Sequence, residues 1–296
     1  MTTIHETFVP KWSSDTAAKS SKETSQQRDV WMASLKSKTF GGWPEIADSL
    51  DTKTIAEHEV DGMKVAAIEF TSQSPYRLTM FAVTPKSSEQ AKAVNVVVLD
   101  QQAWQSVAAG LAAQLPETLP GVTPDEQEWK RLQVDSATAP TVYVAPRGVG
   151  LTEWSRDPVK RTHIRRRFML LGQTAAAMQI YDVVRAMKAI ETLSSFKNAE
   201  LTLHGDGDAA HWSLLASLFN DRVHQISLTD LPLRNRDAPD LLNISRFTEL
   251  PQIAWMAADR VQRMELSGSN MEQWKREFSA IEKDDSSVTF AKVPSN

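Results

Sequence analysis

The sequence has no cysteine among its 296 residues, which excludes disulfide bonds, thiolate metal ligands and a cysteine nucleophile. It has no run of about 18 apolar residues, so no transmembrane helix is expected. The N-terminal segment lacks the apolar centre of a secretory signal peptide, so none is predicted within this chain. A formal net charge of -4 gives no overall field that attracts nucleic acid or an anionic membrane, and neither is expected as a partner.

Residues 1–26 are rich in Ser, Thr and Lys and are predicted to form a tail or linker. Residues 27–296 are predicted to form a single domain, and a hydrophobic content of 41% is enough for a large core. Strand-like runs alternate with helical patterns, which predicts an α/β domain with a mostly parallel eight-stranded sheet and helices on both faces. The expected strands lie at 62–72, 77–85, 95–100, 141–150, 200–205, 223–232, 260–268 and 286–293, and one long helix is expected over 165–193.

The stretch LTLHGDGDAAHWSLLASLF at 201–219 begins as a short apolar run, turns on two glycines and continues as a helical pattern. A nucleophile elbow needs small residues two positions before and after the nucleophile, because its strained turn brings backbone segments close together. Gly205 and Ala209 meet this need, but Gly207 stands at the nucleophile position and has no side chain. If the turn is an elbow, Gly207 is expected to have a positive φ.

Four interpretations of this turn compete. GDGDAA fits the dinucleotide pattern G-x-G-x-x-A, with Asp230 ending the next strand, but Asp206 and Asp208 would place negative charge where a pyrophosphate binds. Asp206 or Asp208 could be a carboxylate nucleophile, although each is one residue out of register and is expected to point away from the pocket. The third interpretation is a hydrolase elbow that has lost its nucleophile. The fourth is a structural turn in which Asp208 caps the helix.

Several segments resemble the α/β-hydrolase domains of bacterial acetyl xylan esterase-like proteins. They read APRGVGLTEWS, RRRFMLLGQTAAAMQIYDVVRAM, LTLHGDGDAAHWSLLASLF, LTDLP and LPQIAWMAADRVQRMEL. The similarity extends from about Phe8 to Val293 and is greatest to the C-terminal of two hydrolase-like domains in long members. The resemblance implies an α/β-hydrolase fold, an upstream catalytic hydrolase domain as a partner, and a secreted or periplasmic parent protein.

Active members of this family carry Gly-x-Ser-x-Gly at the elbow, an acid after the penultimate strand and a histidine after the last strand. By this resemblance the serine position is Gly207, and Asn270 is the nearest polar match to the acid. No histidine follows the last expected strand in this sequence, and Asp100 replaces the customary His-Gly of the oxyanion region. The resemblance therefore implies a domain that no longer forms an acyl-enzyme.

The elbow also carries residues that could act outside a serine triad. His204, Asp206, Asp208 and His211 lie close together in the sequence and could hold a divalent ion or supply an unrecognised catalytic set. None of the six histidines has the H-x-x-x-H or H-E-x-x-H spacing of a helical zinc site. The alternative is that His204 ends a strand and His211 lies on the exposed first turn of the helix. We predict no cofactor and no metal.

Two features suggest a carbohydrate ligand. The basic segment KRTHIRRRF at 160–168 could meet an acidic sugar or a phosphate, although a solvated helix start explains it as well. Trp43, Trp104, Trp154 and Trp212 fall near loops or turns that could share a rim for stacking on sugars, while most large aromatic residues belong to cores. A plant or algal polysaccharide is the expected ligand of such a rim.

The sequence thus favours a non-catalytic α/β-hydrolase-like domain of an acetyl xylan esterase-like protein. One alternative is an active carbohydrate esterase or other hydrolase that uses an unrecognised set around the elbow. Another is a polysaccharide-binding module. The side chain missing at Gly207 is the feature that separates the first two hypotheses.

Overall fold

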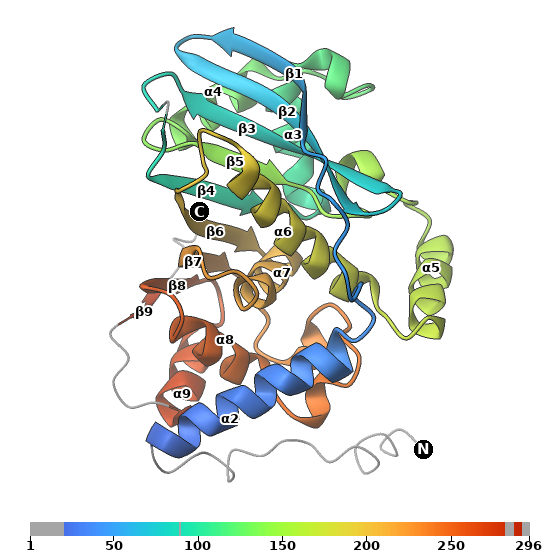
Figure 1. Ribbon diagram of the computed structural model, residues 1–296, viewed down its shortest axis with the longest axis vertical. Coiled ribbons are helices and arrows are strands. Elements are labelled where there is room, and N and C mark those ends of the chain that lie inside the picture. Colours follow the sequence, from blue (N-terminus) through green and yellow to red (C-terminus); the bar gives the residue numbers. More distant parts are fainter. Residues whose placement is uncertain (1–20, 89, 282–286, 292–296) are drawn as a thin grey trace.

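A computed structural model describes residues 21–88, 90–281 and 287–291 of the chain. Within these residues one nine-stranded sheet has the order β1-β2-β3-β5-β4-β6-β7-β8-β9 (Figure 1). Antiparallel pairing joins β1 to β2, β2 to β3 and β3 to β5, and the six strands from β5 to β9 in this order are parallel. The strands are β1 Lys53–Val60, β2 Met63–Gln73, β3 Tyr76–Pro85, β4 Ala93–Val98, β5 Thr141–Val144, β6 Glu200–Asp206, β7 Val223–Thr229, β8 Arg263–Ser267 and β9 Val288–Ala291.

The mostly parallel α/β sheet is confirmed, but it has one strand more than the eight expected. The additional strand is β1, which lies at the edge of the sheet and has no buried residue. It reads KTIAEHEV and pairs its charges with neighbours, as in the Lys64–Glu57 and Lys86–Glu59 ion pairs. An edge strand with no buried residue carries no apolar run, so the pattern of buried strands does not reveal it.

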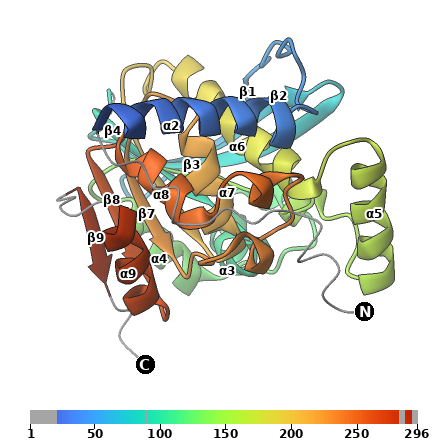
Figure 2. The same ribbon diagram turned by 90° about the horizontal axis from the view of Figure 1, so that it is seen from below.

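The helices cover both faces of the sheet, with α3 and α6 on opposite sides (Figure 2). The helices are α2 Ser21–Ser34, a π-helix at Leu35–Thr39, α3 Gln101–Ala112, α4 Glu126–Asp135, α5 Pro158–Leu170, α6 Ala175–Thr192, α7 Asp208–Ser217, α8 Leu250–Ala258 and α9 Met271–Ile281. Short 3-10 helices lie at Pro116–Thr118, Gly150–Thr152, Asn235–Asp237 and Ile244–Arg246. No described helix combines the length and the apolar character needed to span a bilayer.

The single long helix expected over 165–193 is wrong, because the structure contains two helices there. Helix α5 ends at Leu170, and Gly172 follows with φ +71, a conformation that favours glycine. Helix α6 then begins with a new cap, in which the Thr174 hydroxyl accepts a hydrogen bond from Ala177 N at 3.0 Å. The break separates α5, which has no buried residue, from α6, which is largely buried.

The N-terminal helix also differs from its expected start. The tail was predicted to extend to residue 26, but α2 already begins at Ser21, so part of the expected tail is helical. The expected tail residues 1–20 lie outside the described residues. The last strand, β9, falls within the 286–293 range predicted for it, although residues 286, 292 and 293 also lie outside the description.

A buried ion pair joins the loop after β5 to helix α6 and the end of β2. The Arg147 guanidinium donates to both carboxylate oxygens of Asp182 at 2.8 Å, and the Arg147 backbone N–H donates to Oδ2 at 2.8 Å. The Ser72 hydroxyl donates to Asp182 Oδ1 at 2.5 Å. Because the Asp182 side chain is 0% exposed, its charge depends entirely on these partners.

Candidate functional site

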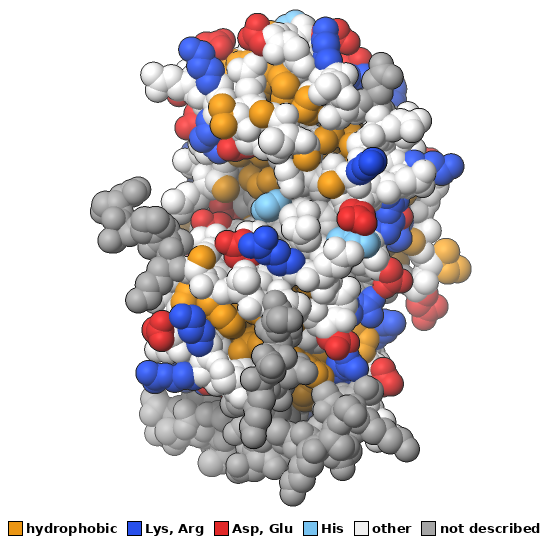
Figure 3. All heavy atoms as spheres, turned by 90° about the vertical axis from the view of Figure 1, so that its left-hand side faces the viewer, with side chains coloured by type: hydrophobic (Ala, Val, Ile, Leu, Met, Phe, Trp, Pro, Cys, Tyr) orange, Lys and Arg blue, Asp and Glu red, His pale blue; other side chains and the backbone are white. Residues whose placement is uncertain are grey.

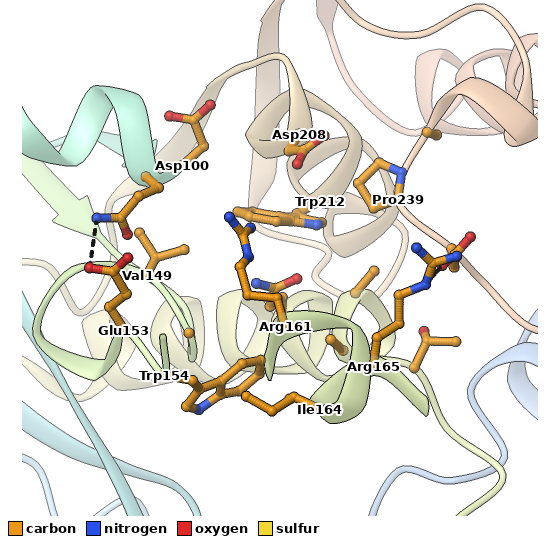
Figure 4. Close-up of a pocket in the computed structure, with 18 of the residues that line it drawn as sticks. Asp100, Val149, Glu153, Trp154, Arg161, Ile164, Arg165, Asp208, Trp212 and Pro239 are labelled. Atoms are coloured by element: carbon orange, nitrogen blue, oxygen red, sulfur yellow. Dashed lines mark hydrogen bonds and ion pairs between the residues drawn. The ribbon is translucent and has the colours of Figure 1, made fainter. Parts of the chain in front are cut away.

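A cavity of about 810 Å³ lies beyond the carboxyl ends of β4, β5 and β6 (Figure 4). This is the edge at which ligands bind in open α/β sheets, because the connecting loops diverge there. One wall, the elbow wall, is the elbow helix α7 with the start of α3, and α5 lies across the cavity from it (Figure 4). The residues that line the cavity include Asp100, Gln101, Trp154, Arg161, Ile164, Arg165, Gln179, Asp208, Trp212 and Asp240.

The turn at Gly207 has the backbone of a nucleophile elbow. Gly207 follows β6, caps α7 and has φ 53 and ψ -116, so the positive φ expected from the sequence is confirmed. Residues with a β-carbon rarely adopt such angles, and they do so mainly where surrounding structure imposes the strain. The geometry of an elbow is therefore present, although the side chain that would use it is absent.

Gly205 shows why the elbow needs small residues around it. A β-carbon at this position would lie 2.5 Å from Ala209 O and 2.7 Å from Ala210 N, both backbone atoms of the first turn of α7. The backbone of α7 thus packs directly on the end of β6. This close approach confirms the reason given for the small residues at the turn.

Gly205→Ala is expected to lower the free energy of unfolding by about 1–3 kcal/mol, because the added carbon forces backbone atoms apart. Urea unfolding measures the loss. Gly172→Ala is the control, because its added carbon meets nothing within 4 Å and only its φ of +71 is unfavourable. A Gly205→Ala variant as stable as the unchanged protein would contradict the close packing at the elbow.

Asp100, which the family resemblance places in the oxyanion region, lies between the end of β4 and the start of α3. It caps α3, and its Oδ1 accepts a hydrogen bond from Ala103 N at 2.8 Å. Its other oxygen, Oδ2, lies 3.9 Å from the position of a β-carbon on Gly207. The carboxylate is therefore directed at the elbow, where a developing negative charge would need hydrogen-bond donors instead.

The pKa values of the two acidic residues of the turn, Asp206 and Asp208, are both raised, first by burial and then by nearby carboxylates. Burial raises the pKa of Asp206, and the charges of Asp230 and Asp100 raise it further. Burial also raises the pKa of Asp208, together with the charge of Asp100, while Arg161 acts in the opposite direction. Asp230, which has φ 47 and accepts a hydrogen bond from Ser269 N at 3.1 Å, was not considered part of this acidic group from the sequence.

The four alternative residues of the elbow do not converge on the cavity. Asp208 lines the cavity, so the expectation that it points away is wrong, whereas Asp206 is not among the lining residues. His204 lies on β6, with its Nε2 3.2 Å from Asn95 Oδ1, and burial lowers its pKa. His211 is 1% exposed, which corrects the expected exposed position, and burial lowers its pKa to about 3.

The structure also shows where the residues considered for a metal site and for a catalytic triad lie. The described residues contain no group of three or more histidines and acids placed to hold a metal ion. Asn270, the match to the acid position, donates from its amide to Leu231 O at 3.2 Å. The segment after β9, where the resemblance would place a catalytic histidine, contains no histidine in the sequence and lies outside the described residues.

Two of the four tryptophans proposed for a sugar-binding rim line the cavity. Trp154 is 39% exposed and packs beside Phe168 with ring centroids 5.5 Å apart, while Trp212 is 4% exposed and forms part of the elbow wall. The other two were wrongly placed on the rim. Trp43 packs against Phe40 and donates to Ala177 O at 2.8 Å, and Trp104 is 7% exposed.

The arginines of α5 were not assigned to the site from the sequence beyond the basic character of residues 160–168. Arg161, Ile164 and Arg165 reach from α5 into the cavity, opposite Asp208 and Trp212 (Figure 4). Their spacing of three and four residues places them on one side of the helix. This spacing can be read from the sequence. That this side of α5 faces the cavity became clear only from the structure, in which α5 is separate from α6.

No family model and no curated protein sequence matches the chain. Among solved structures, a Bacteroides fragilis protein whose name assigns it as an acetyl xylan esterase aligns with a TM-score of 0.69 and 11% identity, over 95% of this chain and 77% of that chain. A glucuronoyl esterase from Solibacter usitatus aligns with a TM-score of 0.64 and 10% identity, over 97% and 94%. Acetyl xylan esterase 1 from a Thermoanaerobacterium species gives 0.56 and 10%, over 92% and 87%.

The chain thus has the α/β-hydrolase fold, in the form found in these carbohydrate esterases. Structural similarity at 10–11% sequence identity shows that the fold is shared, but it does not show that the activity is shared. The α/β-hydrolase fold and the esterase-like architecture expected from the sequence are both confirmed.

Proposed function

We propose that this chain is an esterase-like domain that does not hydrolyse esters. The observation that carries the proposal is the elbow, where Gly207 has no side chain and Asp100 Oδ2 lies 3.9 Å from where a β-carbon would be. Acyl transfer needs a nucleophile, a base and a group that orients the base. Gly207 supplies no nucleophile, and the charge of Asp100 opposes the oxyanion that the reaction would form.

The alternative of an active hydrolase would have to use residues around the same turn. Asp208 is the one member of the set His204, Asp206, Asp208 and His211 that lines the cavity. A carboxylate nucleophile needs a partner to activate water, but His211 is buried and its pKa is lowered to about 3. His204 is held against Asn95 on β6. This arrangement favours the non-catalytic proposal.

The test is hydrolysis of p-nitrophenyl acetate and of acetylated xylan by the purified protein. We expect rates equal to those of buffer. Asp206→Asn, Asp208→Asn and His204→Ala variants are assayed in parallel. A hydrolysis rate that stays the same in all three variants would indicate a contaminating esterase. Turnover above the buffer rate that one of these changes abolishes would falsify the proposal and assign that residue to catalysis.

A second proposed function, polysaccharide binding, is favoured by the cavity itself. Its lining combines the exposed ring of Trp154 with the amides of Gln101 and Gln179 and the carboxylate of Glu153. An aromatic face beside amide and carboxylate groups suits a sugar ring, which has an apolar face and a rim of hydroxyl groups. In this proposal the domain holds a plant or algal polysaccharide for an upstream catalytic hydrolase domain.

A further inference from the structure

We infer that the polysaccharide bound by this domain carries anionic groups, carboxylate or sulfate, and that helix α5 recognises them. The inference rests on the polysaccharide-binding function proposed above. Helix α5 reads PVKRTHIRRRFML and carries five Lys and Arg residues without an Asp or Glu. On the face opposite α5, basic and acidic side chains are interspersed (Figure 3). The positive charge of α5 is therefore a local feature of a chain whose net charge is -4.

The basic side chains of α5 are largely available to a ligand. Arg165 pairs with Asp240 at 2.5 Å. Lys160, Arg161, Arg166 and Arg167 form no ion pair within the described part of the chain. Uncompensated like charges three and four residues apart destabilise a helix. Helix α5 also buries no residue, so packing in the core does not account for its sequence.

Arg161 connects this basic surface to the cavity. It reaches toward the elbow wall, and Trp154 lies below it (Figure 4). A guanidinium can donate two parallel hydrogen bonds to a carboxylate or a sulfate, which makes it well suited to a charged sugar. The exposed Trp154 ring beside it supplies a surface for the apolar face of the same sugar.

The charges around the cavity also set the orientation of the ligand. Asp100 and Asp208 make the elbow wall negative, and α5 makes the facing wall positive. The anionic groups would therefore lie along α5, and a neutral part of the ligand would face the elbow. A helix of 13 residues is roughly 20 Å long, so its charges extend beyond a single sugar.

The experiment measures the affinity of the protein for three polymers by isothermal titration calorimetry at low salt. The probes are polygalacturonate, which carries carboxylates, carrageenan, which carries sulfates, and neutral xylan. We expect binding to at least one anionic polymer at least tenfold tighter than to neutral xylan, weakening as salt is added. The two anionic polymers distinguish a carboxylate ligand from a sulfate ligand.

Three variants assign the effect to α5 and Trp154. The double variant Arg166→Gln/Arg167→Gln is expected to weaken anionic binding about tenfold and to leave xylan binding unchanged, and Arg161→Gln is expected to weaken anionic binding about tenfold. Trp154→Ala is expected to weaken binding to every polymer that binds. Lys130→Gln is the matched control, because Lys130 is an exposed cation on the separate helix α4.

The outcomes separate this inference from the functions proposed above. Equal binding to xylan and to the anionic polymers overturns the anionic specificity and leaves polysaccharide binding in place. No binding to any polymer overturns both, and ester hydrolysis tests the non-catalytic proposal independently. Equally tight binding to single-stranded DNA or to phosphatidylserine vesicles also overturns the inference, because α5 would then attract any polyanion.

Discussion

Replacing Asp182 with alanine is expected to lower the free energy of unfolding by about 3–5 kcal/mol. The variant leaves the Arg147 guanidinium buried without its counter-ion, since the Arg147 side chain is only 8% exposed. It also leaves the Ser72 hydroxyl and the Arg147 backbone N–H without the acceptor that they share. Each of these unpaired groups adds a desolvation cost to the lost ion pair.

Urea unfolding of Asp182→Ala, followed by tryptophan fluorescence, measures this loss. The double variant Arg147→Met/Asp182→Leu is the control, because it removes both charges together. We expect it to recover much of the stability, since an apolar pair avoids the burial of an unpaired charge. A loss below about 1 kcal/mol for Asp182→Ala would mean that the pair is not buried as described.

Acidification from pH 7.5 to pH 5 is expected to cost about 2 kcal/mol of stability through His211 alone. Burial lowers the pKa of His211 to about 3 in the folded protein, against an ordinary value of 6.5. The folded state therefore holds the neutral ring, whereas the unfolded chain gains a proton below pH 6.5. The stability contributed by the neutral ring is complete above pH 6.5 and is lost as the pH falls toward 3.

The measurement compares the unfolding free energies of the protein and of His211→Leu at pH 7.5 and pH 5. The variant should lose less stability on acidification by about 2 kcal/mol. His163→Gln, which removes an exposed histidine from α5, is the control for a histidine substitution outside the core. An identical pH dependence in the protein and in His211→Leu would show that His211 is accessible to protons in the fold.

Most of the sheet and the elbow could be predicted from the sequence because they depend on local patterns. Buried parallel strands read as apolar runs, and the spacing of Gly205, Gly207 and Ala209 predicts a tight turn between a strand and a helix. β1 escaped detection because none of its residues is buried, so it carries no apolar run. The break at Gly172 escaped detection because helical patterns continue on both sides of it.

The site could be predicted only in part, because its composition depends on how distant segments meet. His211 was expected on an exposed turn, but every residue of α7 from Ala209 to Ser217 is buried, so the helix shows no polar face. The approach of Asp100 to Gly207 joins the ends of two parallel strands that are about a hundred residues apart. Arg161 enters the cavity from α5, whose basic sequence left both an anionic ligand and simple solvation open.

The central claim is that the elbow is intact in its backbone and lacks the groups needed for catalysis. The most direct measurement is hydrolysis of p-nitrophenyl acetate by Gly207→Ser beside the unchanged protein, with circular dichroism to verify that the variant folds. A folded Gly207→Ser should hydrolyse the ester no faster than buffer, because Asp100 faces the new hydroxyl and the described residues place no histidine at the cavity. Rapid hydrolysis by the variant, or any turnover by the unchanged protein that Asp208→Asn abolishes, would contradict the claim.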